Sequence, residues 1–497
     1  MKNKEYEYLD EKLAAYAKSD YYPFHMPGHK RAAMDFENPY QIDVTEIDGF
    51  DNLHYAQDLL LRSQERLRGL YKSKKAYFMV NGSSGGILSA VGALTKCGDK
   101  IVMARNCHKS VYNAVKLFQL KAQFVYPRLL TCGIQGGIQA DDIEQCLQIH
   151  RDARLVIITS PTYDGIVSDI QKISEIARKY HTYLIIDEAH GAHFSLSPYF
   201  PESAVRLGAD LVIQSLHKTL PCFTQSAVLH IAGDRVDFHK LEEMLRVFQT
   251  SSPSYILMAG MEKCVRILID KGEQLFEAYA ERLADFYKKC RNFKCLRLLT
   301  ADDYDAAYFF EADQSKIIIS TMHTALSGQA LDQKLSEEYH LQMEMYSAQY
   351  VLAMTSIMDR QEGFDRLFHA LYAIDQEQQR ELRKECIDWD NNTKYNYNMD
   401  NDFKDFLKNA YAERKKVLEI SEIDDDNIVE TNLEDCAGET SAEYVYLYPP
   451  GIPMIVPGEI ITHELIELLN QCRKSQMNVQ GTRDQQYRKI LTVAQKR

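Results

Sequence analysis

One apolar run that ends on a carboxylate constrains the fold most strongly. The run Leu184–Ile186 leads directly into Asp187, which predicts a buried strand that carries the aspartate to its carboxyl-terminal end. In open α/β sheets, ligands bind at that end of the strands. A second apolar run, 211–213, is followed by Ser-Leu-His-Lys ending at Lys218. The chain between the two residues has room for a helical crossover and a parallel strand, so we expect both side chains at one crevice.

An acid and an amine placed in this way suit pyridoxal phosphate. A lysine holds that cofactor as a Schiff base, and the cofactor withdraws electrons best while its ring nitrogen is protonated. A carboxylate beside the ring nitrogen favours the protonated form. Taken singly, a helix cap for Asp187 and a solvated cation for Lys218 are the commoner roles of these residue types. Whether Asp187 and Lys218 form a site therefore depends on the residues that follow the other predicted strands.

Predicted strands and helices alternate on both sides of this pair, which favours an α/β fold with a mainly parallel sheet and helices on both faces. His108 follows one strand and Thr162 another, so both should converge on the crevice, although a capping or core role would be the better guess for His108 alone. The expected strands are 76–80, 101–104, 124–126, 155–159, 184–187, 211–213, 227–231 and, in a smaller α/β portion, 316–320. The expected helices are 55–71, 87–94, 110–120, 141–150 and 170–180.

The segment Asn81–Gly86, between a predicted strand and a predicted helix, has the composition of an anion site. Glycines let backbone amides approach an anion, hydroxyls donate to it, and the start of a helix favours negative charge. Ser83, Ser84 and Gly85 could hold a cofactor phosphate. A plain turn explains the same residues equally well.

Composition narrows the class of protein further. The 497 residues predict about three domains, or one large domain with additions, and the net charge of −13 argues against general binding to nucleic acid or anionic membranes. We expect no signal peptide and no membrane span. The odd number of 11 cysteines, with no Cys-x-x-Cys pair, disfavours a disulfide framework or zinc site, and together these features indicate the cytoplasm.

Two irregular segments leave their roles open. Phe24–Arg31 contains Pro27 and Gly28, and is either a basic surface turn or an arm that reaches an active site; metal binding is the least favoured role. The segment 446–459 contains four prolines and two glycines, and either holds Glu459 in a site or acts as a brace between domains. Between them, residues 377–430, which include Asp388–Thr393, are rich in charge and should be partly helical and solvated, with Asp424–Asp426 as exposed surface.

Six motifs in order resemble those of the ornithine/lysine/arginine decarboxylase family of type I fold pyridoxal phosphate enzymes, in its compact bacterial form. The resemblance covers nearly the whole chain. The motifs are Phe24–Lys30, Asn81–Gly85, Arg105–Ser110, Asp187–Gly191, Ser215–Lys218 and the proline-rich segment that ends at Glu459.

The resemblance implies a role for each matching residue. Lys218 would form the Schiff base, Asp187 would pair with the pyridinium nitrogen, and His108 would stack on the cofactor ring, which makes these three the catalytic residues. Thr162 and His190 would lie beside the ring, with His190 near the substrate carboxylate or the cofactor's phenolic oxygen. The phosphate would be held by Ser83, Ser84, Gly85, Ser215 and His217.

The implied reaction is the decarboxylation of arginine, ornithine or lysine to an amine and carbon dioxide, feeding polyamine synthesis. Lys218 or His108 would return a proton to Cα. The cationic end of the substrate needs a carboxylate, for which Asp48, Asp51 and Glu459 are candidates. Alternatives are an aminotransferase or aldolase-like reaction on the same core, or a homologue that binds the cofactor without catalysis.

The resemblance also implies an organisation. We expect an amino-terminal arm at 1–50, a large cofactor-binding domain at 51–310, a small α/β domain at 311–376, and a linker with a carboxyl-terminal domain at 377–497. Family members are homodimers or larger homo-oligomers with sites completed across the interface, which would give the arm its role. Glu439 departs from the residue that family members often carry, so its carboxyl-terminal contact is open.

Overall fold

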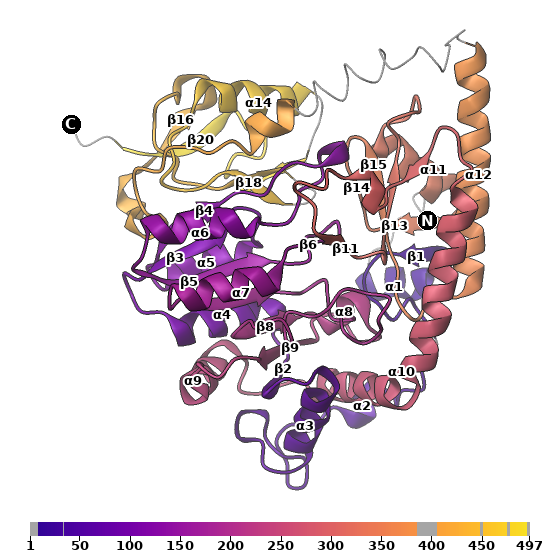
Figure 1. Ribbon diagram of the computed structural model, residues 1–497, viewed down its shortest axis with the longest axis horizontal. Helices are drawn as coiled ribbons and strands as arrows, with labels where there is room; N and C mark the ends of the chain where they lie inside the picture. The colour runs from indigo at the N-terminus through magenta and orange to yellow at the C-terminus, as the bar shows by residue number, and fades with distance from the viewer. Residues whose placement is uncertain (1–7, 33, 385–404, 448–450, 475–477, 495–497) are drawn as a thin grey trace.

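The computed structural model describes residues 8–32, 34–384, 405–447, 451–474 and 478–494 (Figure 1). Its main sheet has seven strands in the order β2-β9-β8-β7-β5-β3-β4. All neighbouring strands are parallel except β9, which runs antiparallel to both β2 and β8. The predicted mainly parallel sheet is therefore confirmed. Its strands are β2 (Lys75–Met79), β3 (Lys100–Ala104), β4 (Lys121–Val125), β5 (Ala153–Thr159), β7 (Tyr183–Asp187), β8 (Leu211–Gln214) and β9 (Ala227–Ile231).

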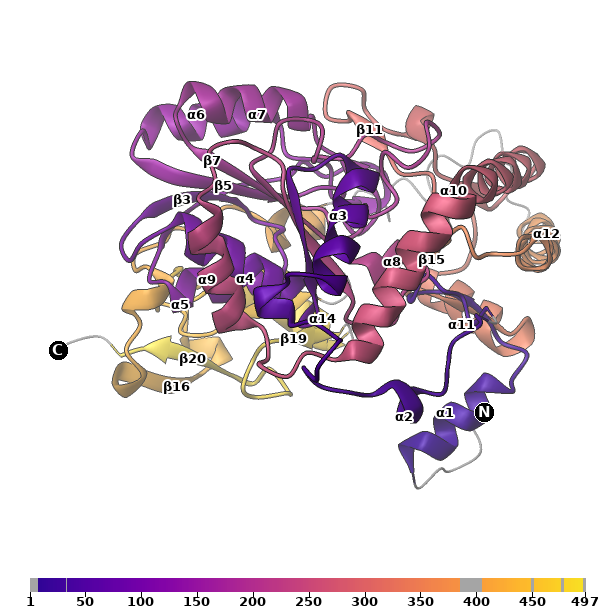
Figure 2. The ribbon, with the colours of Figure 1, turned by 90° about the horizontal axis from the view of Figure 1, so that it is seen from below.

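Helices cover both faces of this sheet, as predicted. In Figure 2, α6 (Ala140–Ile149) and α7 (Ile170–Lys179) lie on one face, and α4 (Gly82–Leu94), α5 (Lys109–Leu117) and α9 (Phe238–Phe248) lie on the other. The central strands β7, β8 and β9 are almost entirely buried and mostly apolar, because helices cover both faces of the sheet there. Within the described parts of the chain, no helix is both long and apolar enough to cross a lipid bilayer.

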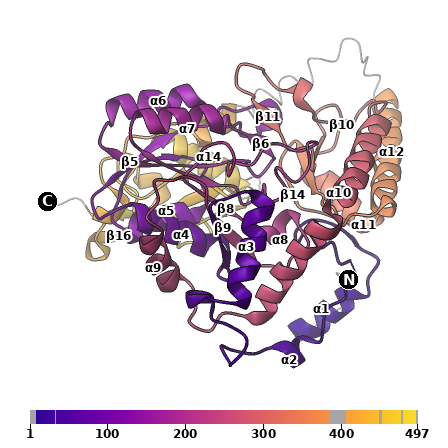
Figure 3. The ribbon, with the colours of Figure 1, turned by 60° about the horizontal axis from the view of Figure 1, so that its bottom comes forward.

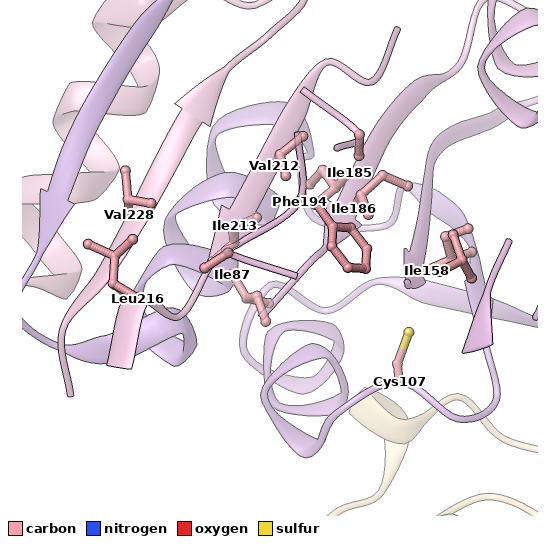
Figure 4. Packing of buried hydrophobic residues seen from close by; sticks show 14 of the residues in the cluster. Ile87, Cys107, Ile158, Ile185, Ile186, Phe194, Val212, Ile213, Leu216 and Val228 are labelled. Carbon is pink, nitrogen blue, oxygen red and sulfur yellow. The ribbon is translucent and has the colours of Figure 1, made fainter. Parts of the chain in front are cut away.

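Close packing of α4 on β8 brings the start of this helix to the carboxyl-terminal edge of the sheet. Figure 4 shows Ile87 of α4 beside Ile213 of β8. Gly86 permits this approach, because a Cβ there would lie 3.1 Å from Cγ2 of Ile213. Both isoleucines are fully buried, so the helix and the strand share one core.

The connection from β7 to β8 differs from the expected helical crossover. Residues 188–210, all of which are described, form turns and bends without a helix. The buried carboxylate of Glu188 organises them, because it accepts hydrogen bonds from Ser203 Oγ at 2.6 Å, Ala204 N–H at 2.8 Å and Gln214 Nε2 at 2.6 Å. Burial raises the pKa of Glu188 to about 7. A side chain, rather than helical bonds, therefore holds this segment on the sheet.

A second, smaller sheet lies beside two long helices. It is four-stranded and antiparallel, in the order β10-β12-β15-β14. Its strand β12 (Lys316–Ser320) has the limits expected from sequence. Figure 1 shows α10 and α12 side by side at the outer edge of the molecule. The remaining elements here are β10 (Arg297–Leu298), β14 (Met345–Tyr346), β15 (Tyr350–Met354), α10 (Tyr255–Cys290), α11 (Gly328–Glu338), α12 (Gln361–Lys384), and the pair β6 (Ile166–Val167) with β11 (Glu311–Ala312).

The amino-terminal arm passes under this sheet to the segment that carries Lys218 (Figure 3). The Gly28 N–H donates to the His217 carbonyl at 2.6 Å, and a Cβ at Gly28 would lie 2.7 Å from the Leu220 nitrogen. Lys30 is buried, and its Nζ donates to two backbone carbonyls at 2.7 Å. The interpretation of this segment as a surface turn is therefore wrong. The arm contains α1 (Leu9–Ala17), β1 (Tyr22–Phe24), which pairs with β13 (Leu341–Met343), α2 (Pro39–Ile42) and, after it, α3 (Leu59–Tyr71).

The carboxyl-terminal residues form a unit with its own apolar core, above β3 and β4 in Figure 1. Asp424–Asp426 are exposed, as predicted, whereas Asp388–Thr393 lie outside the described residues. The proposed domain limits stay a prediction. The elements are β16 (Ile428–Asn432), β17 (Val445–Leu447), β18 (Ile452–Ile455), α14 (His463–Lys474), β19 (Val479–Gln480) and β20 (Lys489–Val493).

Glu459 joins this unit to the main sheet. Its two carboxylate oxygens accept from Nη1 and Nη2 of Arg105, each at 2.8 Å, and both side chains are buried. Arg105 directly follows β3, so the pair links the two parts of the molecule. Of the two expected roles, the structure favours the brace. The candidate role of Glu459 at the substrate stays a prediction without structural support, because its side chain is fully buried and bonds to Arg105 and to the Val456 N–H.

We expect the substitution Glu459→Gln to destabilise the protein by about 3–5 kcal/mol, because it leaves the buried Arg105 charge without its partner. The measurement is the midpoint of urea unfolding, followed by circular dichroism. The matched control is Asp141→Asn, which breaks an ion pair whose side chains are 52% and 72% exposed and should leave the midpoint unchanged. Equal midpoints for both variants would contradict a stabilising role for the buried pair.

Candidate active site

Lys218 lies in the short helix α8 (Leu216–Thr219), which follows β8. Its Nζ is 2.9 Å from Nε2 of His190. Burial lowers the pKa of Lys218 to about 8, the Asp187 carboxylate opposes this shift, and the Lys316 ammonium adds to it. Because an amine is nucleophilic only when neutral, this environment makes Lys218 suitable for attack on an aldehyde.

Asp187 ends β7 and is 2% exposed. One of its carboxylate oxygens accepts from the Ala189 N–H at 3.2 Å. Burial raises the pKa of Asp187, and the nearby Lys218 charge opposes the increase. The strand-end rule thus places this carboxylate near Lys218, as the sequence predicted, even though the crossover between them is not helical.

His190 lies beside Lys218, and Tyr163 lies beside His190. The two rings are 4.8 Å apart between centroids, at 55° to each other. Burial, followed by the Lys218 charge, holds the pKa of His190 well below its ordinary value, so its ring is neutral. Nδ1 of His190 is buried without a hydrogen-bond partner in the described part of the chain, and can therefore pair with a bound group.

His108 and Thr162 follow β3 and β5. His108 caps α5, and its Nδ1 is 2.8 Å from Ser110 Oγ. Burial, and then the Lys218 charge, lowers its pKa, which puts the ring within the electrostatic reach of the lysine. Thr162 is buried, and its Oγ1 accepts from the Ile166 N–H at 3.1 Å.

Polar groups suited to an anion surround the start of α4 and α8. Ser83, Ser84 and Gly85 form the first turn of α4. Near α8, the hydroxyls of Ser215 and Thr219 are buried and have no hydrogen-bond partner among the described residues. The His217 Nδ1 lies 2.9 Å from the Ser226 carbonyl, which orients its ring. Orphaned hydroxyls and a helix start fit a phosphate group, so the residues present fit pyridoxal phosphate.

The remaining candidates do not gather here. The carboxylate of Asp51 accepts from backbone N–H groups, including those of Asp58 and Leu60, which explains its lowered pKa. Asp48 is exposed on the arm. Like Glu459, neither forms a described contact with the residues around Lys218, and their roles toward a substrate stay predictions without structural support.

The structure adds charged residues that the sequence analysis missed. Lys316, at the start of β12, has a fully buried ammonium 3.7 Å from Asp313, whose carboxylate also lies 3.1 Å from His193 Nε2. Glu344 contacts the arm at Met26. For Lys316, the only sequence signal was its position at the start of a predicted strand, and Glu344 had no signal. Tertiary contacts alone bring these two residues to Lys218.

The fold and this site define a pyridoxal phosphate-dependent enzyme of the type I fold. A model of the family described as Orn/Lys/Arg decarboxylase, major domain, matches residues 8–346, and the carboxyl-terminal domain of that family matches residues 399–484. The chain therefore belongs to the Orn/Lys/Arg decarboxylase family. The resemblance drawn from the six motifs is confirmed.

Relatives and solved structures agree with this assignment. The chain is 28% identical to an arginine decarboxylase of Halalkalibacterium halodurans over 97% of this chain and 96% of the relative. It is 21% identical to the constitutive lysine decarboxylase of Escherichia coli over 92% of this chain and 77% of the relative. The lysine decarboxylase of Francisella novicida shares its fold, with a TM-score of 0.74 and 20% identity over 97% of this chain and 80% of that one.

This protein is therefore a pyridoxal phosphate-dependent decarboxylase of a basic amino acid. The expected cofactor and class of reaction are confirmed. When bound, the cofactor supplies an electron sink that weakens the bond from Cα to the carboxylate. The chain's own part is to anchor the cofactor, to orient the substrate and to hold protons at stated atoms.

We expect the cofactor-free chain to take up pyridoxal phosphate with a rate that rises with pH and has its midpoint near pH 8, because only the neutral Lys218 amine attacks the aldehyde. In Asp187→Asn, the charge that raises the pKa of Lys218 is lost, so the midpoint should move to lower pH. Stopped-flow absorbance measures both rates, with Asp141→Asn as the unchanged control. A midpoint near the ordinary lysine value of 10.5 would contradict a desolvated amine.

Proposed function

We propose that this enzyme decarboxylates arginine to its amine, with Lys218 as the cofactor-anchoring residue. The observation that carries the proposal is the pairing of Lys218, whose pKa is about 8, with the buried Asp187 and the neutral His190. Arginine is favoured over lysine because relatives named arginine decarboxylase match at 28% identity over nearly their full length, against 21% for a lysine decarboxylase. The amine product would serve polyamine synthesis.

In this proposal, each residue has a stated task. Asp187 holds the proton on the cofactor's ring nitrogen, and His108 covers the ring. Ser83, Ser84, Gly85, Ser215 and His217 hold the phosphate, while Thr162 lies beside the ring. After carbon dioxide leaves, Cα needs a proton, and Lys218 and His108 are the donors within reach of the site. His190, being neutral, accepts from the lysine through Nε2 and offers Nδ1 to a bound group.

The test is a panel of arginine, ornithine and lysine, with carbon dioxide and the amine both quantified. We expect the highest kcat/KM for arginine, and a loss of at least about 1,000-fold in Lys218→Ala. Borohydride reduction of the cofactor-loaded protein, followed by peptide mass spectrometry, should trap the cofactor on Lys218. Formation of a keto acid in place of carbon dioxide would favour an aminotransferase, and reduction that labels another lysine would contradict the assignment of Lys218.

We also propose that the enzyme is a homodimer or larger homo-oligomer. The arm and the start of α3 expose apolar side chains that a monomer would leave in water, among them Tyr40 at 95%, Tyr55 at 64% and Ile47 at 50%. Several large apolar side chains exposed within one segment of the chain favour an interaction site. Nine of the ten cysteines in the described ranges, all but Cys132, are free thiols, which supports a reducing cytoplasm as the place of action.

We expect the double substitution Tyr40→Asp and Ile47→Asp to convert the assembly to smaller species, because it puts charges into the proposed apolar contact. Light scattering coupled to size exclusion measures the mass. The matched control is Ile149→Asp, at a side chain that is 77% exposed at the end of α6 and should leave the mass unchanged. A wild-type protein that elutes as a monomer at micromolar concentration would contradict the proposal.

A further inference from the structure

We propose that Glu188 is a positioning residue for the reaction, which holds the His190 ring at the Lys218 amine. Glu188 directly follows Asp187, and successive residues of an extended chain point to opposite faces. The Asp187 carboxylate acts on Lys218, whereas the Glu188 carboxylate points into the interior, where only 2% of the residue is exposed. This inference rests on the proposed function, in which His190 acts at Lys218.

Glu188 is bonded to β8, the strand that leads to Lys218. Its N–H donates to the Ile213 carbonyl at 2.8 Å, and its carboxylate accepts from Gln214 Nε2 at 2.6 Å. Gln214 ends β8, and α8 with Lys218 follows it. A main-chain bond and a side-chain bond to two adjacent, fully buried residues therefore set where Glu188 lies relative to Lys218.

The turn that carries His190 is closed on Glu188. The Gly191 N–H donates to the Glu188 carbonyl at 2.9 Å. A Cβ at Gly191 would lie 2.7 Å from Cγ of Glu188, so the turn packs directly on this side chain. His190 lies within the turn, and its Nε2 is 2.9 Å from Lys218 Nζ. Glu188 thus joins the two parts of the chain whose side chains meet in the site.

The Glu188 carboxylate also fixes the later part of the same loop. It accepts from the Ser203 hydroxyl at 2.6 Å and from the Ala204 N–H at 2.8 Å. With the bond from Gln214, it accepts three bonds, all from uncharged donors, and no lysine or arginine in the described ranges forms an ion pair with it. An amide at this position can reproduce part of these bonds, whereas a methyl group cannot.

Two further contacts hold the far side of the turn. The Tyr71 hydroxyl donates to the Ala192 carbonyl at 2.5 Å, and His193 Nε2 lies 3.1 Å from the Asp313 carboxylate. Neither contact involves β8, since Tyr71 belongs to α3 and Asp313 precedes β12. Loss of the Glu188 side chain should therefore displace the turn without releasing it from the protein.

The first test is a double-mutant cycle with His190, measured as kcat for the basic amino acid that the wild-type enzyme decarboxylates. Glu188→Ala should lower kcat by about 100-fold, because a misplacement of about 1 Å costs that much. In a His190→Ala background, the same change should cost no more than about twofold, because the residue that Glu188 positions is already absent. Glu188→Gln should retain part of the activity that Glu188→Ala loses. Losses that multiply in the double variant would overturn the inference.

The second test is the rate of cofactor uptake as a function of pH, followed by stopped-flow absorbance. Burial is the largest cause of the lowered pKa of Lys218. A displaced His190 turn admits water to the amine, so the midpoint of uptake in Glu188→Ala should move from near pH 8 toward the ordinary lysine value of 10.5. Glu188→Gln should show a smaller shift. An unchanged midpoint in Glu188→Ala would contradict the proposed role.

Ser203→Ala keeps the acid and removes one of its three bonds, so it tests the inference even if Glu188→Ala does not fold. Its loss of kcat should be smaller and should again disappear in the His190→Ala background. The matched control is Glu338→Gln, at a carboxylate on α11 that is 55% exposed and pairs with Lys334, and it should alter neither measurement. If the wild-type protein releases carbon dioxide from no basic amino acid, the proposed function fails, whereas cofactor uptake still tests Glu188.

Discussion

The interaction on which the site depends is the attraction between two charges that have been removed from water. Asp187 and Lys218 leave neighbouring strands of one sheet, and the burial that raises the pKa of the acid also lowers that of the amine. Each charge limits the effect of burial on the other. The result is an amine that is partly neutral near physiological pH, beside an acid that can hold a proton on a ring nitrogen.

Two segments that are distant in the sequence lie around this pair. Hydrogen bonds to a carboxylate and to a backbone carbonyl hold them there. Glu188 collects the irregular segment after β7, and the Gly28 N–H joins the arm to the carbonyl next to Lys218. Each of these bonds is buried, where an unpaired group would cost about 1–3 kcal/mol. The irregular segments around the site are therefore as firmly positioned as the strands that precede them.

The hydrogen-bond partners of two further carboxylates, Glu459 and Glu344, also distinguish their roles. Glu459 and Arg105 neutralise one another at the contact between the carboxyl-terminal unit and β3, where neither group touches solvent. Glu344, by contrast, is oriented by an amide and a hydroxyl, which bring no positive charge. One carboxylate thus joins the carboxyl-terminal unit to the main sheet, and the other joins the amino-terminal arm to Tyr163 in the site.

The sequence by itself determined the sheet, its strands and the residues that their ends present, because apolar runs and the polar groups after them are local patterns. Lys218, Asp187, His108 and Thr162 were found this way, and six ordered motifs were sufficient for the family. Tertiary structure decided the antiparallel direction of β9, the irregular path from β7 to β8, the partner of Glu459, and the presence of Lys316 and Glu344 near the amine. These depend on which distant groups neutralise or hydrogen-bond one another once water is excluded, and no local pattern records that choice.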